Sequence, residues 1–415
     1  MLLLIIIKNQ EELIVRFIIF AALKHTVFPF YQLSIFEVNL INFQTLTISD
    51  IVLLALFSVV FIIQMYYMLG IYLKLALHKK ELVSADTNPA TILLTLRNEE
   101  PRIREMMTTL TELPYNDYQV MVINEFSEDD TLHILNILAE TNHRIKVTSL
   151  SQETRFLQKQ AINIGMKGAE SPLIVQITSN SKPFSNEWLA KLNELMDNNT
   201  DAVIAYTNVE KKKGYRNLIC RLEGFTQFMI SGSWILAGKP FVFQENNILF
   251  RKSMYFENQG FKHKLNLNFA NLELIFNENF RKGKVKISTN PELSVRENVE
   301  DDRGDHIKLL KKGVQIRQSL NWSRKISLFI DDFSKVAMIG LSTALFILHP
   351  EYWITFASFV IIYAITLLII VKKLLTRLKE RKIFVYSFAY ILIKPIINWW
   401  FFWSMYLIHR RNRWN

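Results

Sequence analysis

The feature that most constrains this chain is an apolar run from Ile51 to Leu75, which is long enough for a helix to cross the hydrocarbon core of a membrane. Half of the 415 residues are hydrophobic, a composition that fits a chain with membrane segments. We therefore expect a transmembrane helix over residues 51–78 and a chain anchored in a lipid bilayer.

Two further apolar runs lie near the C-terminus, from Val336 to His349 and from Trp353 to Val371. They are separated by a short segment that contains Pro350, which favours a tight turn over a continuous helix. This pattern predicts a helical hairpin at the start of a C-terminal group of transmembrane or interfacial helices, residues 333–409.

A last apolar run, from Ile383 to Ile408, is rich in aromatic residues and has Lys394 and Pro395 near its middle. Tryptophan concentrates at the surfaces of membranes. The pattern leaves open whether this segment spans the membrane, re-enters it or lies in its surface.

The charge of the chain points to a membrane rather than to nucleic acid. There are 49 Lys and Arg residues against 38 Asp and Glu residues, and basic clusters flank the apolar runs at residues 78–80, 372–382 and 410–413. Such clusters mark the cytoplasmic flanks of membrane helices. We therefore expect a multi-pass membrane protein with a cytoplasmic soluble domain, and no nucleic-acid partner.

The N-terminal segment, residues 1–50, and the single cysteine, Cys220, each limit what the chain can be. Residues 1–50 are apolar only in short stretches that charges interrupt, and they lack the pattern of a cleaved signal peptide, so their role stays open. A single cysteine, Cys220, excludes an internal disulfide framework.

Between the apolar runs, short β-type segments alternate with segments of helical spacing. The expected strands are 91–96, 118–123, 144–150 and 173–178, and the expected helices are 103–113, 131–140 and 159–169. Alternation of this kind predicts an α/β fold with a mostly parallel sheet covered by helices. Ligands bind such sheets at the carboxyl ends of the strands, so the residues after each strand are the candidates for a site.

The polar residues after these strands form an ordered series. It comprises Arg97-Asn98-Glu99-Glu100, Asn124 to Thr131, Lys159-Gln160-Ala161-Ile162-Asn163, Ser179-Asn180-Ser181-Lys182, Asn247 to Arg251, Leu272-Glu273 and Gln318 to Trp322. In order and spacing, the series resembles the motifs of inverting family 2 glycosyltransferases of GT-A fold, particularly of membrane-bound bacterial members. The resemblance covers about residues 88–326 and the flanking helices, and it implies a Rossmann-like GT-A domain that uses a nucleotide-sugar donor.

The resemblance implies a donor site at the strand ends. Its residues would be Arg97, Glu99, Asn124, Glu125, Asp129, Lys159, Ser179, Asn180, Ser181 and Lys182. The segment from Asn124 to Thr131 also fits a helix N-terminus that is capped by Ser127 and has Asp129 in its first turn, because these residue types are favoured there. We expect both roles.

The metal-binding motif of the family is altered in this chain. The family's D-x-D motif, which binds Mg²⁺ or Mn²⁺, falls on Ser179 and Ser181. Neutral hydroxyls are poor ligands for hard divalent cations, so we expect metal binding to be weak or absent. Lys182, Lys159 and Arg97 are candidates to hold the donor diphosphate instead, although most surface charges are simply solvated.

Glu273 takes the position of the family's catalytic base, the second residue of an E-D pair whose first position is Leu272 here. One carboxylate suffices to accept the proton of an acceptor hydroxyl. The surrounding segment, 271–276, fits an ordinary helix with one exposed Glu equally well.

The acceptor and diphosphate side would comprise Asn247, Arg251, Gln318 and Trp322. On a single helix, Gln318 and Trp322 would share a face because they are four residues apart. Asn321 replaces the family's Arg, and a helix in the membrane surface with Trp322 at headgroup level explains the same residues at least as well.

Two classes of function remain. One is an enzyme that transfers a sugar, with inversion, from a nucleotide-sugar donor to an envelope glycan or a lipid-linked acceptor. The other is a catalytically degenerate homologue that binds a glycan, a nucleotide or a partner subunit as a scaffold, and the missing carboxylates favour it. A transporter is disfavoured because the membrane runs are poor in ionisable residues.

Overall fold

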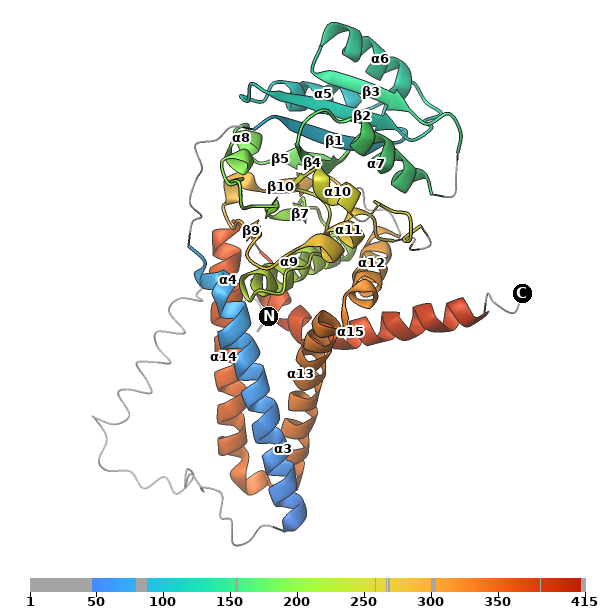
Figure 1. Cartoon of the computed structure of the whole chain (residues 1–415). Helices are drawn as coiled ribbons and strands as arrows, with labels where there is room; N and C mark the ends of the chain where they lie inside the picture. Colours follow the sequence, from blue (N-terminus) through green and yellow to red (C-terminus); the bar gives the residue numbers. More distant parts are fainter. Residues whose placement is uncertain are drawn as a thin grey trace.

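The computed structural model describes residues 47–79, 88–153, 156–257, 259–265, 267, 269–299, 304–380 and 382–411. Nearly all of the N-terminal segment 1–50 lies outside these ranges. In Figure 1, an α/β domain rests on a layer of helices, and a rod of long helices extends from the other side of that layer. The described chain thus has a sheet domain and a helical rod joined by a middle layer.

The core of the upper domain is a seven-stranded sheet with the order β3-β2-β1-β4-β8-β6-β9. Its strands are β1 (Ala90–Leu96), β2 (Tyr118–Asn124), β3 (Ile145–Ser149), β4 (Leu173–Thr178), β6 (Ala202–Ile204), β8 (Ile248–Arg251) and β9 (Val285–Ile287). Neighbouring strands are parallel except where β8 pairs with β4 and β6. The predicted mostly parallel α/β sheet and its four predicted strands are confirmed.

Helices cover both faces of this sheet, as the predicted alternation requires. They include α5 (Ile103–Thr111), α6 (Thr131–Thr141) and α7 (Leu157–Gly168). Successive strand residues point to opposite faces, so Ile92 belongs to the core under α5 and α6, whereas Leu93 belongs to the core under α7. The contact with α7 is close: a Cβ at Gly165 would lie 2.3 Å from Leu93 Cδ1.

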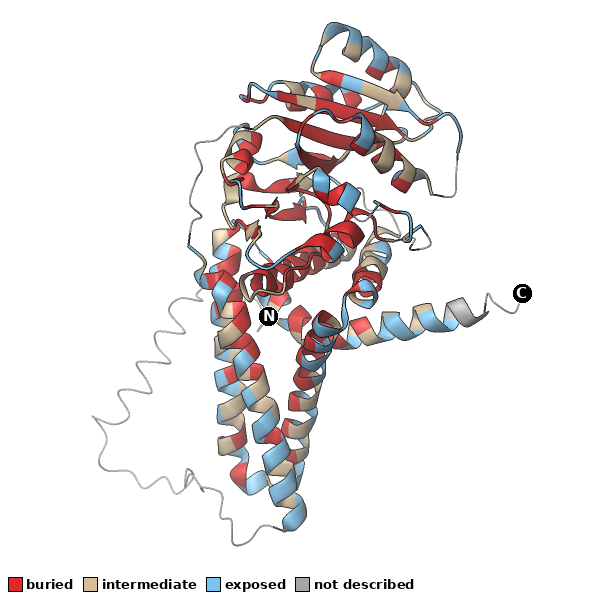
Figure 2. Ribbon diagram, in the orientation of Figure 1, coloured by how far each residue is buried: buried red, intermediate tan, exposed pale blue. Residues whose placement is uncertain are grey.

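A second, smaller sheet and several helices form the middle layer. The sheet has the order β5-β10-β7, with β5 (Ser181–Pro183), β7 (Thr207–Val209) and β10 (Val295–Glu297), and the helices include α8 (Trp188–Asn193), α10 (Ser253–Glu257), α11 (Leu272–Asn279) and α12 (Asp305–Ser319). Beneath them lies α9 (Tyr215–Leu236), which is buried along most of its length (Figure 2) although it contains Glu223 and Gln227. This helix separates the sheet domain from the rod.

The rod is built from three chain segments that run side by side (Figure 1). The first is α3 (Ile48–Met65), which continues through the π-helical turn Tyr66–Tyr72 into α4 (Leu73–Leu77). The others, α13 (Trp322–Leu348) and α14 (Trp353–Arg377), form the predicted hairpin around Pro350. Among the described residues, three helices are long and apolar enough to cross a membrane: Ile48–Leu77, Pro350–Arg377 and Phe384–Leu407.

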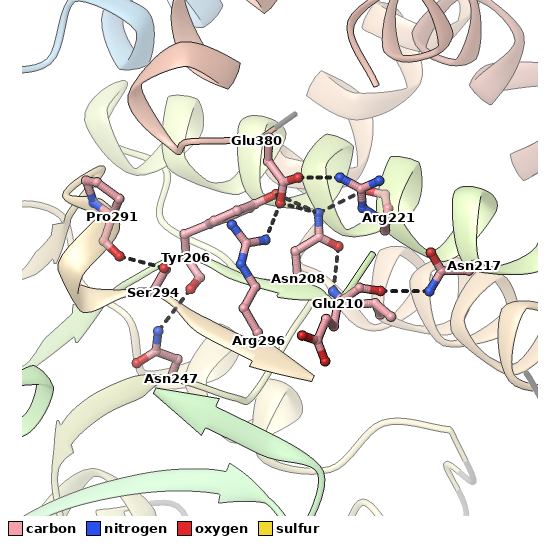
Figure 3. A network of polar contacts seen from close by, with 11 residues as sticks. Tyr206, Asn208, Glu210, Asn217, Arg221, Asn247, Pro291, Ser294, Arg296 and Glu380 are labelled. Atoms are coloured by element: carbon pink, nitrogen blue, oxygen red, sulfur yellow. Dashed lines mark hydrogen bonds and ion pairs between the residues drawn. The ribbon is translucent and has the colours of Figure 1, made fainter. Parts of the chain in front are cut away.

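The buried carboxylate of Glu380 links the sheet domain to the end of the rod that lies nearest to it (Figure 3). Glu380, just after α14, pairs with Arg221 at 2.7 Å and with Arg296, and it accepts a hydrogen bond from Tyr206 at 2.9 Å. Burial raises the pKa of Glu380, but the two guanidinium groups outweigh this effect and lower it. Losing these partners would leave a buried charge uncompensated, so the network stabilises the contact between the domain and the rod.

Candidate functional site

The loops after β1 and β4 meet at the carboxyl edge of the sheet, as the parallel topology requires. The hydroxyl of Ser179 donates a hydrogen bond to Glu99 Oε1 at 2.7 Å, and the backbone N–H of Glu99 donates to Thr131 Oγ1 at 2.9 Å. Three of the predicted strand-end segments are therefore in contact through Ser179, Glu99 and Thr131.

Ser127 links the loop after β2 to the loop after β1 and does not cap helix α6. Helix α6 begins only at Thr131, and Ser127 accepts a hydrogen bond from the backbone N–H of Asn98 at 3.0 Å. The predicted cap at Ser127 is therefore wrong, because the residues from Ser127 to Asp130 form part of the loop. Asp129 accepts hydrogen bonds from the backbone N–H groups of Thr131 and Glu100, at 3.1 and 3.2 Å.

Asn124 and Glu125 end the second strand in different surroundings. Asn124 is buried and donates to Ser149 Oγ at 3.0 Å, so its amide holds the loops together. Glu125 is partly buried: burial raises its pKa, against a hydrogen bond from Thr95 and the positive charge of Arg97. Of this pair, Glu125 is the carboxylate that a ligand can engage.

The predicted cations of the donor site have protein partners. Arg97 pairs with Glu153 at 2.7 Å and with Glu128 at 3.4 Å. The side chain of Lys182 is 72% exposed and lies 3.9 Å from Glu105. Because such exposed pairs contribute little energy, a ligand with a diphosphate can compete for either cation.

The serine pair at the D-x-D position does not fit a divalent cation. Ser179 donates to Glu99, the hydroxyl of Ser181 lies 2.8 Å from that of Thr178, and Asn180 Oδ1 accepts from Arg102 at 2.8 Å. Within the part of the chain that the structure describes, no group of three or more His, Cys, Asp or Glu residues is arranged to hold a metal. Mg²⁺ and Mn²⁺ prefer carboxylate oxygens, so these residues are a poor metal site.

A second polar cluster, built around Glu273, lies in the first turn of α11. The Glu273 side chain is 0% exposed, accepts a hydrogen bond from the backbone N–H of Asn271 at 2.9 Å and pairs with Lys312 of α12. Lys312 Nζ also lies 3.4 Å from Glu245 Oε1, and Glu245 Oε2 accepts from the Leu272 N–H at 3.0 Å. Lys312 therefore bridges two buried carboxylates. The alternative of an ordinary helix with an exposed Glu at this position is wrong.

The surroundings of Glu273 bring the pKa of its carboxyl group close to neutral pH. Burial and the adjacent charge of Glu245 raise the pKa of Glu273 to about 7, although Lys312 opposes the shift. Burial alone would lower the pKa of Lys312, but the two carboxylates raise it, so the lysine stays charged. A carboxyl group with a pKa near 7 has the property that a general base needs at neutral pH.

Lys159 connects this cluster to a pocket beside it. Its ammonium donates to the Leu267 carbonyl at 2.6 Å, and burial lowers its pKa while Glu245 and Glu273 offset part of the shift. The pocket has a volume of about 430 Å³ and lies between α7 and the segment that follows β8. Among the described residues, its lining has three lysines, four aromatic rings and no carboxylate: Phe156, Lys159, Gln160, Asn163, Lys167, Tyr255, Phe256, Gln259, Phe261, Lys262 and Leu265. This chemistry suits an anionic ligand with ring faces.

Three charged residues of the cluster were not identified from the sequence: Glu245, Glu297 and Lys312. Glu297, at the end of β10, accepts a hydrogen bond from Asn246, and burial raises its pKa. No spacing marks these residues, since Lys312 is one of several lysines on α12 and Glu297 lies on a short strand of the second sheet. Only Glu245 had a signal, as the residue directly before the Asn246-Asn247 pair.

Arg251 and Asn247, both predicted on the acceptor side, make structural contacts, and Arg251 lies away from the carboxyl edge of the sheet. Because β8 runs antiparallel to β4, Arg251 lies opposite Leu173, at the amino end of the parallel strands. Its guanidinium binds the carbonyls of Asp197 and Thr200, at 2.7 and 2.9 Å. Asn247 is buried and uses both ends of its amide, accepting from Trp188 Nε1 and donating to the carbonyls of Tyr206 and Leu293.

Gln318 and Trp322 do not share a helix face, contrary to the prediction. Helix α12 ends at Ser319 and α13 begins at Trp322, because Asn321 caps the new helix by accepting from the N–H of Arg324. Trp322 is 76% exposed, and Gln318 is also exposed. On α12, Lys312 and Gln315 reach the site instead, and Gln315 accepts from the Phe269 N–H at 2.9 Å.

Several solved structures are similar to this chain at low identity. A mannosyltransferase from Pyrobaculum calidifontis in complex with GDP-Man and Mn²⁺ has 17% identity over 76% of this chain and 97% of its own, with a TM-score of 0.49. S. aureus TarS 1–349 in complex with UDP-GlcNAc has 13% identity over 75% of this chain and 90% of its own, with a TM-score of 0.42.

The family comparison rests on the sequence itself. No curated protein matches this chain. Residues 91–256, from β1 through β8 and into α10, match the family described as glycosyl transferase family 2. The match covers the parallel strands β1 to β4 and the loops that bear Glu99, Glu125, Ser179 and Glu245. Residues 91–256 of this chain are thus similar to glycosyl transferase family 2, and the apolar helices of the chain make it a membrane-bound protein.

Proposed function

We propose that this protein transfers a sugar from a nucleotide-sugar donor to an envelope glycan or a lipid-linked acceptor, with inversion, and that Glu273 is the catalytic base. One observation supports this most strongly: Glu273 lies on the α11 turn beside Lys159 and Glu245 with a pKa of about 7. At that pKa, about half of the Glu273 carboxyl groups are ionised at pH 7 and able to accept a proton.

The chemical step follows from this assignment. An oxygen of the acceptor hydroxyl attacks the anomeric carbon of the donor sugar, and its proton moves to the Glu273 carboxylate. The bond between the anomeric carbon and the diphosphate oxygen breaks, and the nucleoside diphosphate leaves with that electron pair. Lys312 pairs with Glu273 in the free protein, so this ion pair has to loosen when the acceptor enters.

The negative charge that develops on the leaving diphosphate needs a cation. The serine pair is a poor metal site, whereas Lys159 and Arg97 lie at the same edge as Glu125 and Glu273. Positively charged side chains stabilise developing phosphate charge in such sites. We therefore expect donor binding that does not depend on Mg²⁺ or Mn²⁺.

The position of the domain on the rod gives the proposed topology. Lys372 and Lys373 follow the apolar part of α14 at its domain end, and basic flanks face the cytoplasm. The domain would then lie on the cytoplasmic side of a bacterial inner membrane. An acceptor that is held in or near this membrane would reach the site from the side of the middle layer.

A second candidate function is favoured by the same cluster. Glu273 is fully buried and held by Lys312, and the D-x-D position lacks both carboxylates. A homologue that has lost catalysis would bind a nucleotide or a glycan and act as a scaffold subunit. In that case the Glu273–Lys312 pair is a structural ion pair and never releases a base.

Calorimetric titration of the detergent-purified protein with UDP and with GDP, each with and without Mn²⁺, tests the donor site. Binding that is equal with and without Mn²⁺ supports a site built on lysine and arginine. If neither nucleotide binds, the proposal that this protein is a sugar transferase is refuted. If a nucleotide binds, transfer from the matching nucleotide-sugar to water or to an extracted lipid fraction is measured next, and a Glu273→Gln variant that binds but does not transfer supports the base.

A further inference from the structure

The last helix of the chain, α15 (Phe384–Arg411), is apolar enough to cross a membrane, yet it does not run with the rod. In Figure 1 it leaves the domain end of the rod and extends across it. We propose that α15 lies in the plane of the membrane surface on the domain side, and that its second half is a docking surface for the lipid bilayer. This inference is independent of the proposed catalytic function.

One face of α15 is fixed to the middle layer and to α13 by polar contacts. Tyr390 and Lys394 bind the carboxylate of Glu223 on α9, each at 2.6 Å. Asn398 donates to Asp332 of α13 at 3.1 Å. The three side chains of α15 are four residues apart, so they form a single stripe along the helix.

This stripe favours the crossing orientation over a spanning one. If α15 turned to run along the rod, Glu223 and Lys394 would lose each other as partners. Asn398 and Lys394 would then enter the hydrocarbon, where polar groups have no water to bind. The buried pair therefore orients the first half of α15 beneath α9.

The height of α15 on the rod coincides with a membrane surface. At the far end of the rod, His349 of the hairpin turn lies 3.0 Å from Asp50 of α3, which marks the opposite surface. Along α13, seventeen residues separate Asp332 from His349, a rise of about 25 Å at 1.5 Å per residue. The hydrocarbon core is about 30 Å thick, so the contact between Asn398 and Asp332 lies near its domain-side boundary.

Helix α14 gives the same height independently. Twenty-one residues separate Glu351, at the hairpin turn, from Lys372, a rise of about 31 Å. The apolar stretch of α14 thus ends at the level at which α15 crosses the rod.

The second half of α15 has the composition of a helix at a bilayer surface. It holds Trp399, Trp400, Trp403 and Tyr406, and the sequence from Phe384 to Arg411 contains no Asp or Glu. Trp400 is 72% exposed and Leu407 is 61% exposed in the absence of lipid. Tryptophan and tyrosine prefer the headgroup level, and the absence of acidic residues suits an anionic leaflet.

The test is the depth of spin labels along α15 in nanodiscs that contain phosphatidylglycerol. Single cysteines are placed at Ile393, Trp400 and Leu407, which are seven residues apart and each at least half exposed, in a Cys220→Ser background. Depth is read from the ratio of relaxation by oxygen to relaxation by a water-soluble nickel chelate. A surface helix gives three equal, shallow depths.

The matched control is a pair of exposed positions on α14, Ile362 and Ile369, which are also seven residues apart. Along a spanning helix this spacing changes the depth by about 10 Å. If the α15 labels change depth by the same amount per seven residues, the helix spans and the proposal is overturned. Labels at Trp400 and Leu407 that are fully accessible to the nickel chelate overturn the bilayer contact.

Discussion

Replacing Lys312 by methionine tests whether this residue holds the buried carboxylates of Glu245 and Glu273 together. Its ammonium contacts both, and Glu273 has no exposed surface. Removing one member of a buried ion pair typically costs about 3–5 kcal/mol of stability. We expect a loss of that size in the free energy of unfolding of the domain at pH 8.

The expected pH dependence follows from the pKa of Glu273. In the wild type, the pKa is raised from the ordinary value of 4.5 to about 7, so ionised Glu273 costs the folded state about 3 kcal/mol above pH 7. For an acid whose pKa is higher in the folded protein than in the unfolded chain, the free energy of unfolding is highest below the unfolded-state pKa. It falls as the pH rises through the folded-state pKa. Without Lys312, the pKa of Glu273 rises further. Above that pKa, the free energy of unfolding of the variant is lower than that of the wild type by about 1.4 kcal/mol for each unit by which the pKa has risen.

The assay is urea unfolding of the detergent-purified protein at pH 6 and at pH 8.5, followed by tryptophan fluorescence. Lys308→Met is the matched control, since Lys308 lies on the same helix in an exposed pair with Asp305 at 3.2 Å. That pair is worth less than about 1 kcal/mol. If Lys312→Met costs no more than Lys308→Met, or if its loss does not grow between the two pH values, the assigned role of Lys312 is refuted.

Three further outcomes are expected. If Glu273 is the base, Glu273→Gln lowers the rate of sugar transfer by about 10²–10⁴-fold without changing nucleotide affinity, and wild-type transfer rises with pH through about 7 as the carboxyl ionises; a flat pH profile in steady-state assays contradicts this role. Arg251→Gln costs about 2–3 kcal/mol in urea unfolding because two carbonyls lose a charged donor, with unchanged nucleotide affinity in calorimetry; weaker nucleotide binding would return Arg251 to the site. Gly165→Ala destabilises the domain by about 1–3 kcal/mol, since its Cβ would lie 2.3 Å from Leu93 Cδ1, whereas Gly340→Ala, with nothing within 4 Å, is the neutral control in thermal unfolding.

Much of the fold was predictable because its signals are local. A strand that is buried on both faces is a continuous apolar run, which identified β1, β2 and β4. The hairpin of α13 and α14 followed from two apolar runs around Pro350. Each of these signals depends only on neighbours in the sequence.

The donor edge was predictable for a related reason. Parallel strands place their carboxyl ends at one edge, so Glu99, Glu125 and Ser179 had to converge once the strands were known. The same rule failed for Arg251, because the direction of β8 depends on its partners in the sheet and not on its own residues.

The sequence by itself determined the apolar helices, the order of the strands along the chain and the missing carboxylates at Ser179 and Ser181. Only the tertiary structure decided that Lys312 from α12 neutralises Glu273 from α11, and that Lys394 meets Glu223 and so turns α15 across the rod. Hydropathy is a sum over neighbouring residues, whereas an ion pair joins residues that are far apart in the chain and depends on where packing brings them.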